Sequence, residues 1–205
     1  MTYNAVQLVD YFCQNDNIML SKMNPKISVI FLAVFAVAMT RLIPHWPNVT
    51  AVAAIAIFGG ATLKNSFSAV IIPLTAIFFS DLIINNTFYS AYYEGFVLFG
   101  DSAAWIYSAF ILMTVIAHFS IKSFKSAPIV STTLISTLLF FVLTNIGAWL
   151  SSPFYTQDVA GLILAFEAGL PFVLNSLLGN LFFVGLFFYG YSVVTEKKTQ
   201  WLFVK

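Results

Sequence analysis

The side chains with the most chemical potential lie within an otherwise apolar chain. Asp81 and Asn85 stand four residues apart in the segment FFSDLIINN, and this spacing puts both side chains on one face of a helix. A carboxylate inside a membrane boundary is costly, so it usually faces a protein interior or a wet cavity. Asp81 therefore indicates either a ligand-binding pocket or a structural ion pair with Arg41, and an ion pair in a cavity wall would serve both purposes.

A second group of polar residues forms the corner RLIPHWPN, in which His45 stands between Pro44 and Pro47. Each proline fixes its own backbone and restricts the residue before it, so this corner is stiff. A stiff corner favours a histidine that contacts a ligand or a metal. The alternative is an interfacial histidine beside Trp46, which is common at membrane borders.

Amides and aromatic residues also occur in later predicted helices, near the helix ends that are expected on the same side of the membrane as Asp81 and His45. Asn145 and Trp149 share a face in TNIGAWL, and Asn175 shares a face with Gly179 in GLPFVLNSLLGN. Buried amides in lipid need partners, so they either join helices or line a pocket. Aromatic walls with a few fixed polar groups are the usual lining of a small-molecule site. The predicted binding residues are Arg41, His45, Asn48, Asp81, Asn85, Tyr93, Glu94, Asn145, Trp149 and Asn175.

The composition predicts an all-α membrane protein. Of the 205 residues, 60% are hydrophobic and 8% are charged, whereas soluble domains have about 25% charged residues. The net charge of +1 gives no reason to expect a nucleic-acid partner. The single cysteine, Cys13, excludes an internal disulfide and a cysteine-based metal cluster.

Six membrane crossings are expected, because about 20 apolar residues cross a bilayer core. The second is short, which suggests a helix buried among others, and the sixth is expected to start near Pro171. Residues 1–26 would form a cytoplasmic segment, either an interfacial helix or a loosely ordered tail, before a six-helix domain at 27–195 and a cytoplasmic tail at 196–205. The predicted crossings are 27–43, 49–64, 67–86, 103–121, 128–150 and 170–194.

The distribution of basic residues predicts the orientation. Eight of the nine lie on one side of the six-helix arrangement, and Arg41 alone lies on the other. Because an excess of Lys and Arg marks the cytoplasmic side, both termini are predicted to be cytoplasmic. The expected location is the bacterial inner membrane, which the chain crosses several times.

Small residues on the first two helices could mediate close helix packing. Ala56 and Gly60 are four residues apart, and this spacing lets helix backbones approach closely in lipid. Packing within the chain is the favoured interpretation for this pair, and docking of a partner subunit is the alternative. The first helix carries Ala33, Ala36 and Ala38, a small-residue face that could instead dock another membrane subunit.

Several segments together resemble a known family. RLIPHWPNVTAVAAIAIFGGATL, PLTAIFFSDLI, LTNIGAWL and GLPFVLNSLLGNLFF resemble an uncharacterised bacterial membrane-protein family related to the S-components of energy-coupling-factor transporters. The resemblance covers about residues 27–194. It implies a six-helix bundle with both termini in the cytoplasm and an outer pocket for a vitamin or a metal ion. It also implies association with a transmembrane coupling subunit and two ATPases.

Within this group, S-component-like cobalamin transporters offer the nearest functional analogy. The order of His45, Asp81, Tyr93 and Glu94 is similar to theirs, and it implies a cobalamin-like ligand. Those transporters use a cysteine after the aspartate as a cobalt ligand, whereas Glu94 occupies that neighbourhood here.

The leading functional hypothesis is uptake of a vitamin-like or metal-related small molecule, without enzymatic activity and without a resident cofactor or metal. The sequence has no P-loop, so ATP-driven work would require a partner subunit. The alternative is a non-transporting membrane subunit that scaffolds or regulates another membrane protein. An intramembrane enzyme has only His45, Asp81 and Glu94 to support it, and they would have to converge to hold a catalytic metal.

Overall fold

The computed structural model describes residues 27–43, 46–123 and 125–202. Within these ranges the regular structure is helical and contains no β-strand, which confirms the predicted all-α class for this part of the chain. The predicted segment 1–26 lies outside the described residues. The elements are α2 (Ile27–Leu42), α3 (Val52–Thr62), α4 (Ser66–Thr87), the 3-10 turn η1 (Ser90–Tyr92), α5 (Ala103–Ser120), α6 (Ser126–Ser151) and α7 (Val159–Leu202).

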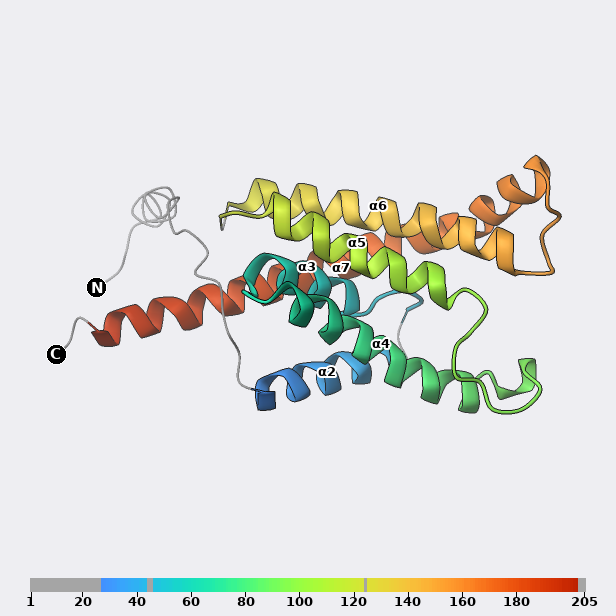
Figure 1. Ribbon diagram of the computed structural model, residues 1–205. Helices are drawn as coiled ribbons and strands as arrows, with labels where there is room; N and C mark the ends of the chain where they lie inside the picture. The colour runs from blue at the N-terminus through green and yellow to red at the C-terminus, as the bar shows by residue number, and fades with distance from the viewer. Residues whose placement is uncertain (1–26, 44–45, 124, 203–205) are drawn as a thin grey trace.

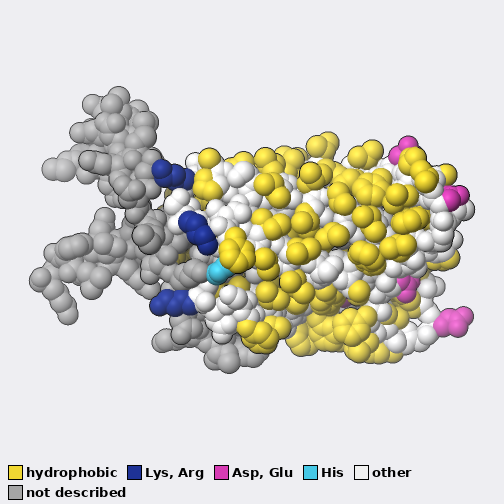
Figure 2. Space-filling view, turned by 45° about the horizontal axis from the view of Figure 1, so that its top comes forward, with side chains coloured by type: hydrophobic (Ala, Val, Ile, Leu, Met, Phe, Trp, Pro, Cys, Tyr) yellow, Lys and Arg dark blue, Asp and Glu magenta, His cyan; other side chains and the backbone are white. Residues whose placement is uncertain are grey.

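The helices run back and forth between two ends of one bundle (Figure 1). Figure 2 shows basic side chains at one end and acidic side chains at the other. The basic end contains the α3–α4 connection with Lys64 and the α5–α6 connection with Lys122 and Lys125. The acidic end contains the α4–α5 connection with Asp101 and the α6–α7 connection with Asp158. The described part of α2 begins, and that of α7 ends, at the basic end.

Large apolar side chains cover the outside of the bundle between its two ends (Figure 2). Phe79, Leu138 and Phe182 are 52%, 61% and 65% exposed. Soluble proteins rarely expose such extensive apolar surface. Four helices, namely α4, α5, α6 and the part of α7 at Val159–Val193, are long and apolar enough to cross a membrane. The protein is therefore a membrane-embedded helical bundle.

The shortest α-helix of the described chain, α3, lies inside the bundle. Its 11 residues extend for about 16 Å, whereas a bilayer core is about 30 Å thick. Every residue of α3 except Phe58 is buried, which confirms the interpretation of the second segment as a helix surrounded by others. The predicted span 49–64 is longer than the helix that forms, and α3 by itself does not reach across a bilayer.

Small residues allow α3 to approach α5 closely. A Cβ atom on Gly60 would lie 2.3 Å from the carbonyl oxygen of Thr114, so this position accepts only glycine without a shift of the helices. Ala56 is completely buried. The structure therefore assigns Ala56 and Gly60 to packing within the chain, and neither is accessible to a partner protein. Of the three small residues proposed on α2, Ala36 is exposed and Ala38 half-buried, while the side chain of Ala33 is outside the described part.

The last helix starts earlier than predicted. The sequence suggested a start near Pro171, but α7 begins at Val159 and contains Pro171 in its interior. The reason is an N-cap: the Asp158 Oδ1 atom accepts hydrogen bonds from the backbone N–H of Gly161 and from the Thr156 hydroxyl, both at 2.8 Å. A capping carboxylate satisfies the free N–H groups of a first turn, whereas proline only removes one of them. The helix also continues to Leu202, beyond the predicted end at residue 194.

The close approach of α3 and α5 gives a direct stability test. Gly60→Leu should lower the free energy of unfolding by about 3 kcal/mol or more, because overpacking at a rigid backbone contact forces the helices apart. Gly185→Leu is the matched control, since a Cβ atom on Gly185 meets nothing within 4 Å. Thermal unfolding in detergent micelles measures both variants. Equal stability of the two would contradict the packing described for α3.

The N-cap of α7 gives a pH test. The hydrogen bonds from Gly161 and Thr156 stabilise the ionised carboxyl of Asp158, so its pKa lies below the ordinary value of 3.8. Because the pKa of the folded state is lowered, this stabilisation is present above pH 3.8 and is lost as the pH falls through the folded-state pKa. Thr156→Val should raise the pKa of Asp158 in a carbon-13 NMR titration, and Ser152→Ala in the same connection should not. A pKa of Asp158 at or above 3.8 in the wild type would refute the capping geometry.

Candidate functional site

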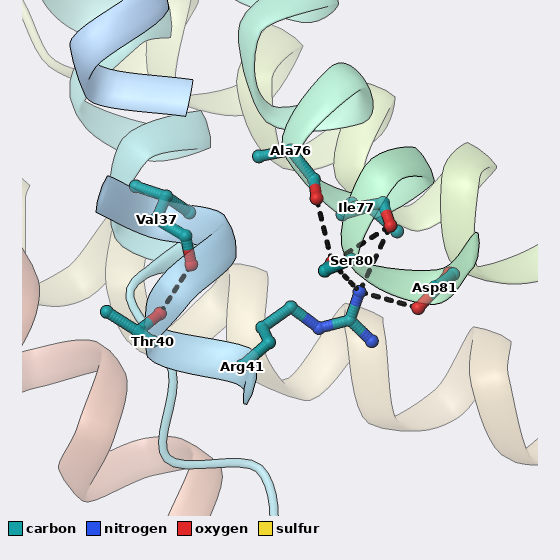
Figure 3. Close-up of polar contacts among 7 residues, drawn as sticks. All are labelled: Val37, Thr40, Arg41, Ala76, Ile77, Ser80 and Asp81. Atoms are coloured by element: carbon teal, nitrogen blue, oxygen red, sulfur yellow. Dashed lines mark hydrogen bonds and ion pairs between the residues drawn. The ribbon is translucent and has the colours of Figure 1, made fainter. Parts of the chain in front are cut away.

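An ion pair between α2 and α4 (Figure 3) adjoins the candidate site through Arg41, whereas Asp81 lines neither cavity described below. Arg41 is the penultimate residue of α2, and its Nη1 atom lies 2.6 Å from Oδ1 of Asp81. The same nitrogen donates to the Ser80 hydroxyl at 2.7 Å and to the carbonyl oxygen of Ile77 at 3.3 Å. The predicted pairing of Arg41 with Asp81 is confirmed. His45, predicted to face the same aspartate, lies outside the described residues.

The surroundings of this ion pair hold it in one geometry. The side chains of Arg41 and Asp81 are 23% and 20% exposed, so water screens their attraction only in part. The Ser80 hydroxyl is buried and lies within hydrogen-bonding distance of the carbonyl oxygens of Ala76 and Ile77, which leaves its oxygen free to accept from Arg41. The guanidinium is therefore held by the buried turn of α4 that contains Ile77 and Ser80 as well as by the carboxylate.

A cavity of about 430 Å³ lies beside Arg41, within the half of the bundle nearer the acidic end. Its volume falls in the range of small-molecule sites. The α2–α3 connection and helices α2 to α7 all contribute to it. The apolar and aromatic lining consists of Pro47, Val52, Ala53, Ile77, Ile84, Tyr89, Ile106, Phe110, Met113 and Phe140, and the polar lining of Arg41, Asn48, Thr50, Ser176 and Asn180.

A second, smaller cavity of about 130 Å³ adjoins the first, since Asn48, Phe140 and Ser176 line both. It lies between α6 and α7 and is also bordered by Asn145. The Asn145 Nδ2 atom donates to the carbonyl oxygen of Phe141 at 2.7 Å. A Cβ atom on Gly169 would lie 2.3 Å from Oδ1 of Asn145, so glycine at this position gives the amide its room.

The α2–α3 connection brings Asn48 to both cavities through an unusual backbone conformation. Asn48 has a φ of 65°, a left-handed conformation that asparagine tolerates better than most residues. The next residue lies against α7, where a Cβ atom on Gly179 would approach the Cα atom of Val49 to 3.1 Å. Glycine at this point of α7 thus lets the connection lie close over the cavity.

Other predicted site residues lie apart from the two cavities. Asn85 and Tyr93 are neighbours near the α4–α5 connection, since both lie within 3.6 Å of a Cβ atom placed on Gly100. Burial, followed by the charges of Asp101 and Asp81, raises the pKa of Tyr93 above its usual range. Neither Asn85 nor Tyr93 lines either of the two cavities described above.

Glu94, Trp149 and Asn175 also do not line these cavities. Glu94 is exposed in the α4–α5 connection. The Trp149 indole nitrogen donates to the carbonyl oxygen of Thr156 at 2.8 Å, which ties the end of α6 to the α6–α7 connection. Asn175 is displaced by one residue from the cavity-lining face of α7, on which Ser176 lies. No cluster of three or more potential metal ligands occurs within the part of the chain that the structure describes.

Sequence reasoning missed the polar floor of the site. Asn180 donates from Nδ2 to the Thr137 hydroxyl oxygen at 2.9 Å, in a buried hydrogen bond between α7 and α6. Ser176 lies one turn earlier on the same face and lines both cavities. The spacing of four between Ser176 and Asn180 puts both on one helix face and is the sequence signal for this floor, whereas the predicted face is that of Asn175 and Gly179. Asn86, next to the predicted Asn85, was missed too, although it bonds both backbone groups of Val97.

The arrangement suits reversible binding of a small molecule. Apolar and aromatic walls surround a few amide and hydroxyl groups, and Arg41, the one ionised side chain among the described lining residues, is neutralised by Asp81. Such a combination provides both apolar contact and orientation for a ligand.

Comparison with family models gives one match, to a family described as "Family of unknown function (DUF6580)", over residues 21–202. The chain belongs to this family. The match includes every described helix of the DUF6580 bundle and both cavities. No curated protein and no solved structure matches the chain. The resemblance to S-components stays a prediction, because the family description carries no such link.

The ion pair of this DUF6580 protein can be tested by substitution. Asp81→Asn should lower the free energy of unfolding by about 1–3 kcal/mol, because the Arg41 charge loses its partner in a partly buried site. The double variant Arg41→Met with Asp81→Leu should lose less, since no unpaired charge remains. Asp101→Asn, at an exposed carboxylate, is the control and should have little effect. If the double variant were the least stable of the three in thermal unfolding, the described role of the pair would be wrong.

Proposed function

We propose that this DUF6580 protein takes up a small organic molecule across the bacterial inner membrane and binds it in the cavity beside Arg41. The observation that carries the proposal is the cavity of about 430 Å³ with an apolar wall, a compensated charge and fixed amides. Ligand sites in membrane bundles commonly lie between helices. The activity proposed is transport and not catalysis.

The charge distribution supports the orientation needed for uptake. Lys64, Lys122 and Lys125 gather at the basic end, which the positive-inside tendency assigns to the cytoplasm. In the proposed arrangement all six helices belong to one multi-pass domain with both termini in the cytoplasm. The cavity then lies in the outer half of the membrane and receives its ligand from outside.

The size of the cavity favours a vitamin-sized ligand over a cobalamin-like one. Cavities of about 430 Å³ suit drug-sized molecules, and a corrinoid with its nucleotide arm is considerably larger. As the sequence contains no nucleotide-binding motif, energy would come from a partner, for which a coupling subunit with ATPases remains the leading suggestion.

One observation favours a second candidate function, that of a subunit which scaffolds or regulates another membrane protein. An apolar groove of about 490 Å³ lies between α2, α3 and α7. Small residues, Ala36 and Gly190, line it together with Phe58 and Leu186. Small residues at a helix surface permit close helix docking in lipid.

Identification of the molecules that copurify with the full-length chain distinguishes the two functions. Uptake predicts that a small molecule copurifies in mild detergent at near-stoichiometric amount, and that Ala53→Trp, which fills the cavity, abolishes its recovery. Leu138→Trp on the exposed surface of α6 is the matched control and should retain the molecule. Untargeted mass spectrometry of the extracted ligand is the measurement.

The opposite result identifies the alternative. A stoichiometric membrane protein in place of a small molecule, lost on Gly190→Trp and kept on Ala53→Trp, would contradict uptake and support the scaffolding function. If neither a small molecule nor a protein accompanied the chain, both proposals would fail.

A further inference from the structure

The hydrogen bonds at the cavity floor fix the orientation of one amide. The Thr137 hydroxyl donates its only hydrogen to the carbonyl oxygen of Thr133 at 2.8 Å, so its oxygen can only accept from Asn180. Asn180 must therefore turn its NH₂ group toward Thr137, at 2.9 Å, and cannot be flipped without losing that bond. The Asn180 Oδ1 atom is left as the acceptor available to the cavity.

The state of this oxygen is unusual for a buried residue. Asn180 is only 5% exposed, and within the described residues no donor to its Oδ1 atom is found. Among the described residues, Ser136 Oγ is the only fully buried side-chain polar atom without a hydrogen-bond partner. The Oδ1 atom of Asn180 is therefore not fully enclosed by protein atoms. Because Asn180 borders the larger cavity, that cavity is the space that can supply the missing donor.

Another residue that lines this cavity, Arg41, offers donors. All three interactions of the Arg41 guanidinium within the described structure use Nη1, as Figure 3 shows. A guanidinium carries five N–H donors in total. The three on Nε and Nη2 make no hydrogen bond to the described residues. Since Arg41 and Asn180 line the same cavity, a bound molecule would meet donors from Arg41 and an acceptor from Asn180.

The charge balance of the cavity restricts the ligand further. Arg41 is the only ionised side chain among the described residues that line either cavity, and Asp81 already pairs with it. A ligand with a net charge would enter an apolar space without a counter-charge, and burying an unpaired ion is costly. The lining is thus complementary to an uncharged molecule.

We propose that the ligand is an uncharged cyclic molecule bearing a carboxamide or lactam group, whose N–H donates to Asn180 Oδ1 and whose carbonyl accepts from Arg41. Its ring would pack against the apolar lining to which Phe110, Met113 and Phe140 contribute, where the Phe110 and Phe140 rings contact each other with their centroids 5.2 Å apart. This inference rests on the proposed function, since it specifies the substrate class of the same cavity.

Matched amide and acid pairs test the inference on the purified full-length chain in lipid nanodiscs. The probes are nicotinamide and nicotinate, benzamide and benzoate, and indole-3-acetamide and indole-3-acetate. We expect the best-binding amide to bind at least about tenfold more tightly than its acid, because one missing buried hydrogen bond and one unpaired charge each cost about that much. Ligand-observed NMR titration gives the Kd values.

Two variants assign the preference to Asn180. Asn180→Leu should reduce amide binding about tenfold or more and leave acid binding unchanged. Thr137→Val keeps the side-chain shape but lets the Asn180 amide rotate, so it should weaken amide binding several-fold. Asn175→Leu, at a residue next to Ser176 but not on the lining face of α7, is the control and should bind as the wild type does.

The failure of this inference can be told apart from failure of the proposed function. Acids that bind as tightly as their amides, or an Asn180→Leu variant that keeps the amide preference, would overturn the assigned substrate class. Absence of binding by all six probes would overturn it as well. In each case the copurification of a small molecule with the wild type, and its loss on Ala53→Trp, decides separately whether the cavity is a substrate site.

Discussion

The ion pair between Arg41 and Asp81 is the interaction on which the rest of the site depends. The helix α2 packs mainly against α4 and barely touches α3, so the contact at the end of α2 decides where the following connection starts. Arg41 Nη1 binds the carboxylate, the Ser80 hydroxyl and the Ile77 carbonyl together. The connection that carries Asn48 then passes over the cavity from a fixed point. Arg41, which lies away from the basic end that holds Lys64, Lys122 and Lys125, thus has a definite structural role.

The cavity itself follows from the shortness of α3 and from glycines at close contacts. The helix α3 begins only at Val52, so a connection instead of a helical turn lies above it toward the acidic end. Gly60 lets α3 pack closely against α5, and Gly179 lets Val49 lie close against α7. Space that a full-length helix would have filled is left between Arg41 and Asn180. Tight packing in one half of the bundle and an open volume in the other are therefore two consequences of one short helix.

Sequence reasoning predicted the features that depend on composition and on local spacing. Apolar runs gave the helices, the brevity of the second run predicted its burial, and the lone Arg41 pointed to Asp81. It failed where tertiary contacts decide between neighbouring residues. Asn175 and Ser176 differ by one position, or about 100° around a helix, and only the packing of α7 on α6 selects Ser176. Likewise, the cap of α7 arises from Asp158 and Thr156 acting together, which outweighs the familiar preference of proline for a first turn.

The central claim is that the space between Arg41 and Asn180 is a binding site and not an incidental packing gap. The most direct measurement is an experimental structure of the full-length chain purified from its native membrane, by cryo-electron microscopy with a bound antibody fragment. We expect density not belonging to the protein within hydrogen-bonding distance of Asn180 Oδ1 and the Arg41 guanidinium, with Arg41 still paired to Asp81. A cavity filled by collapsed side chains, or Arg41 turned away from Asp81, would contradict it.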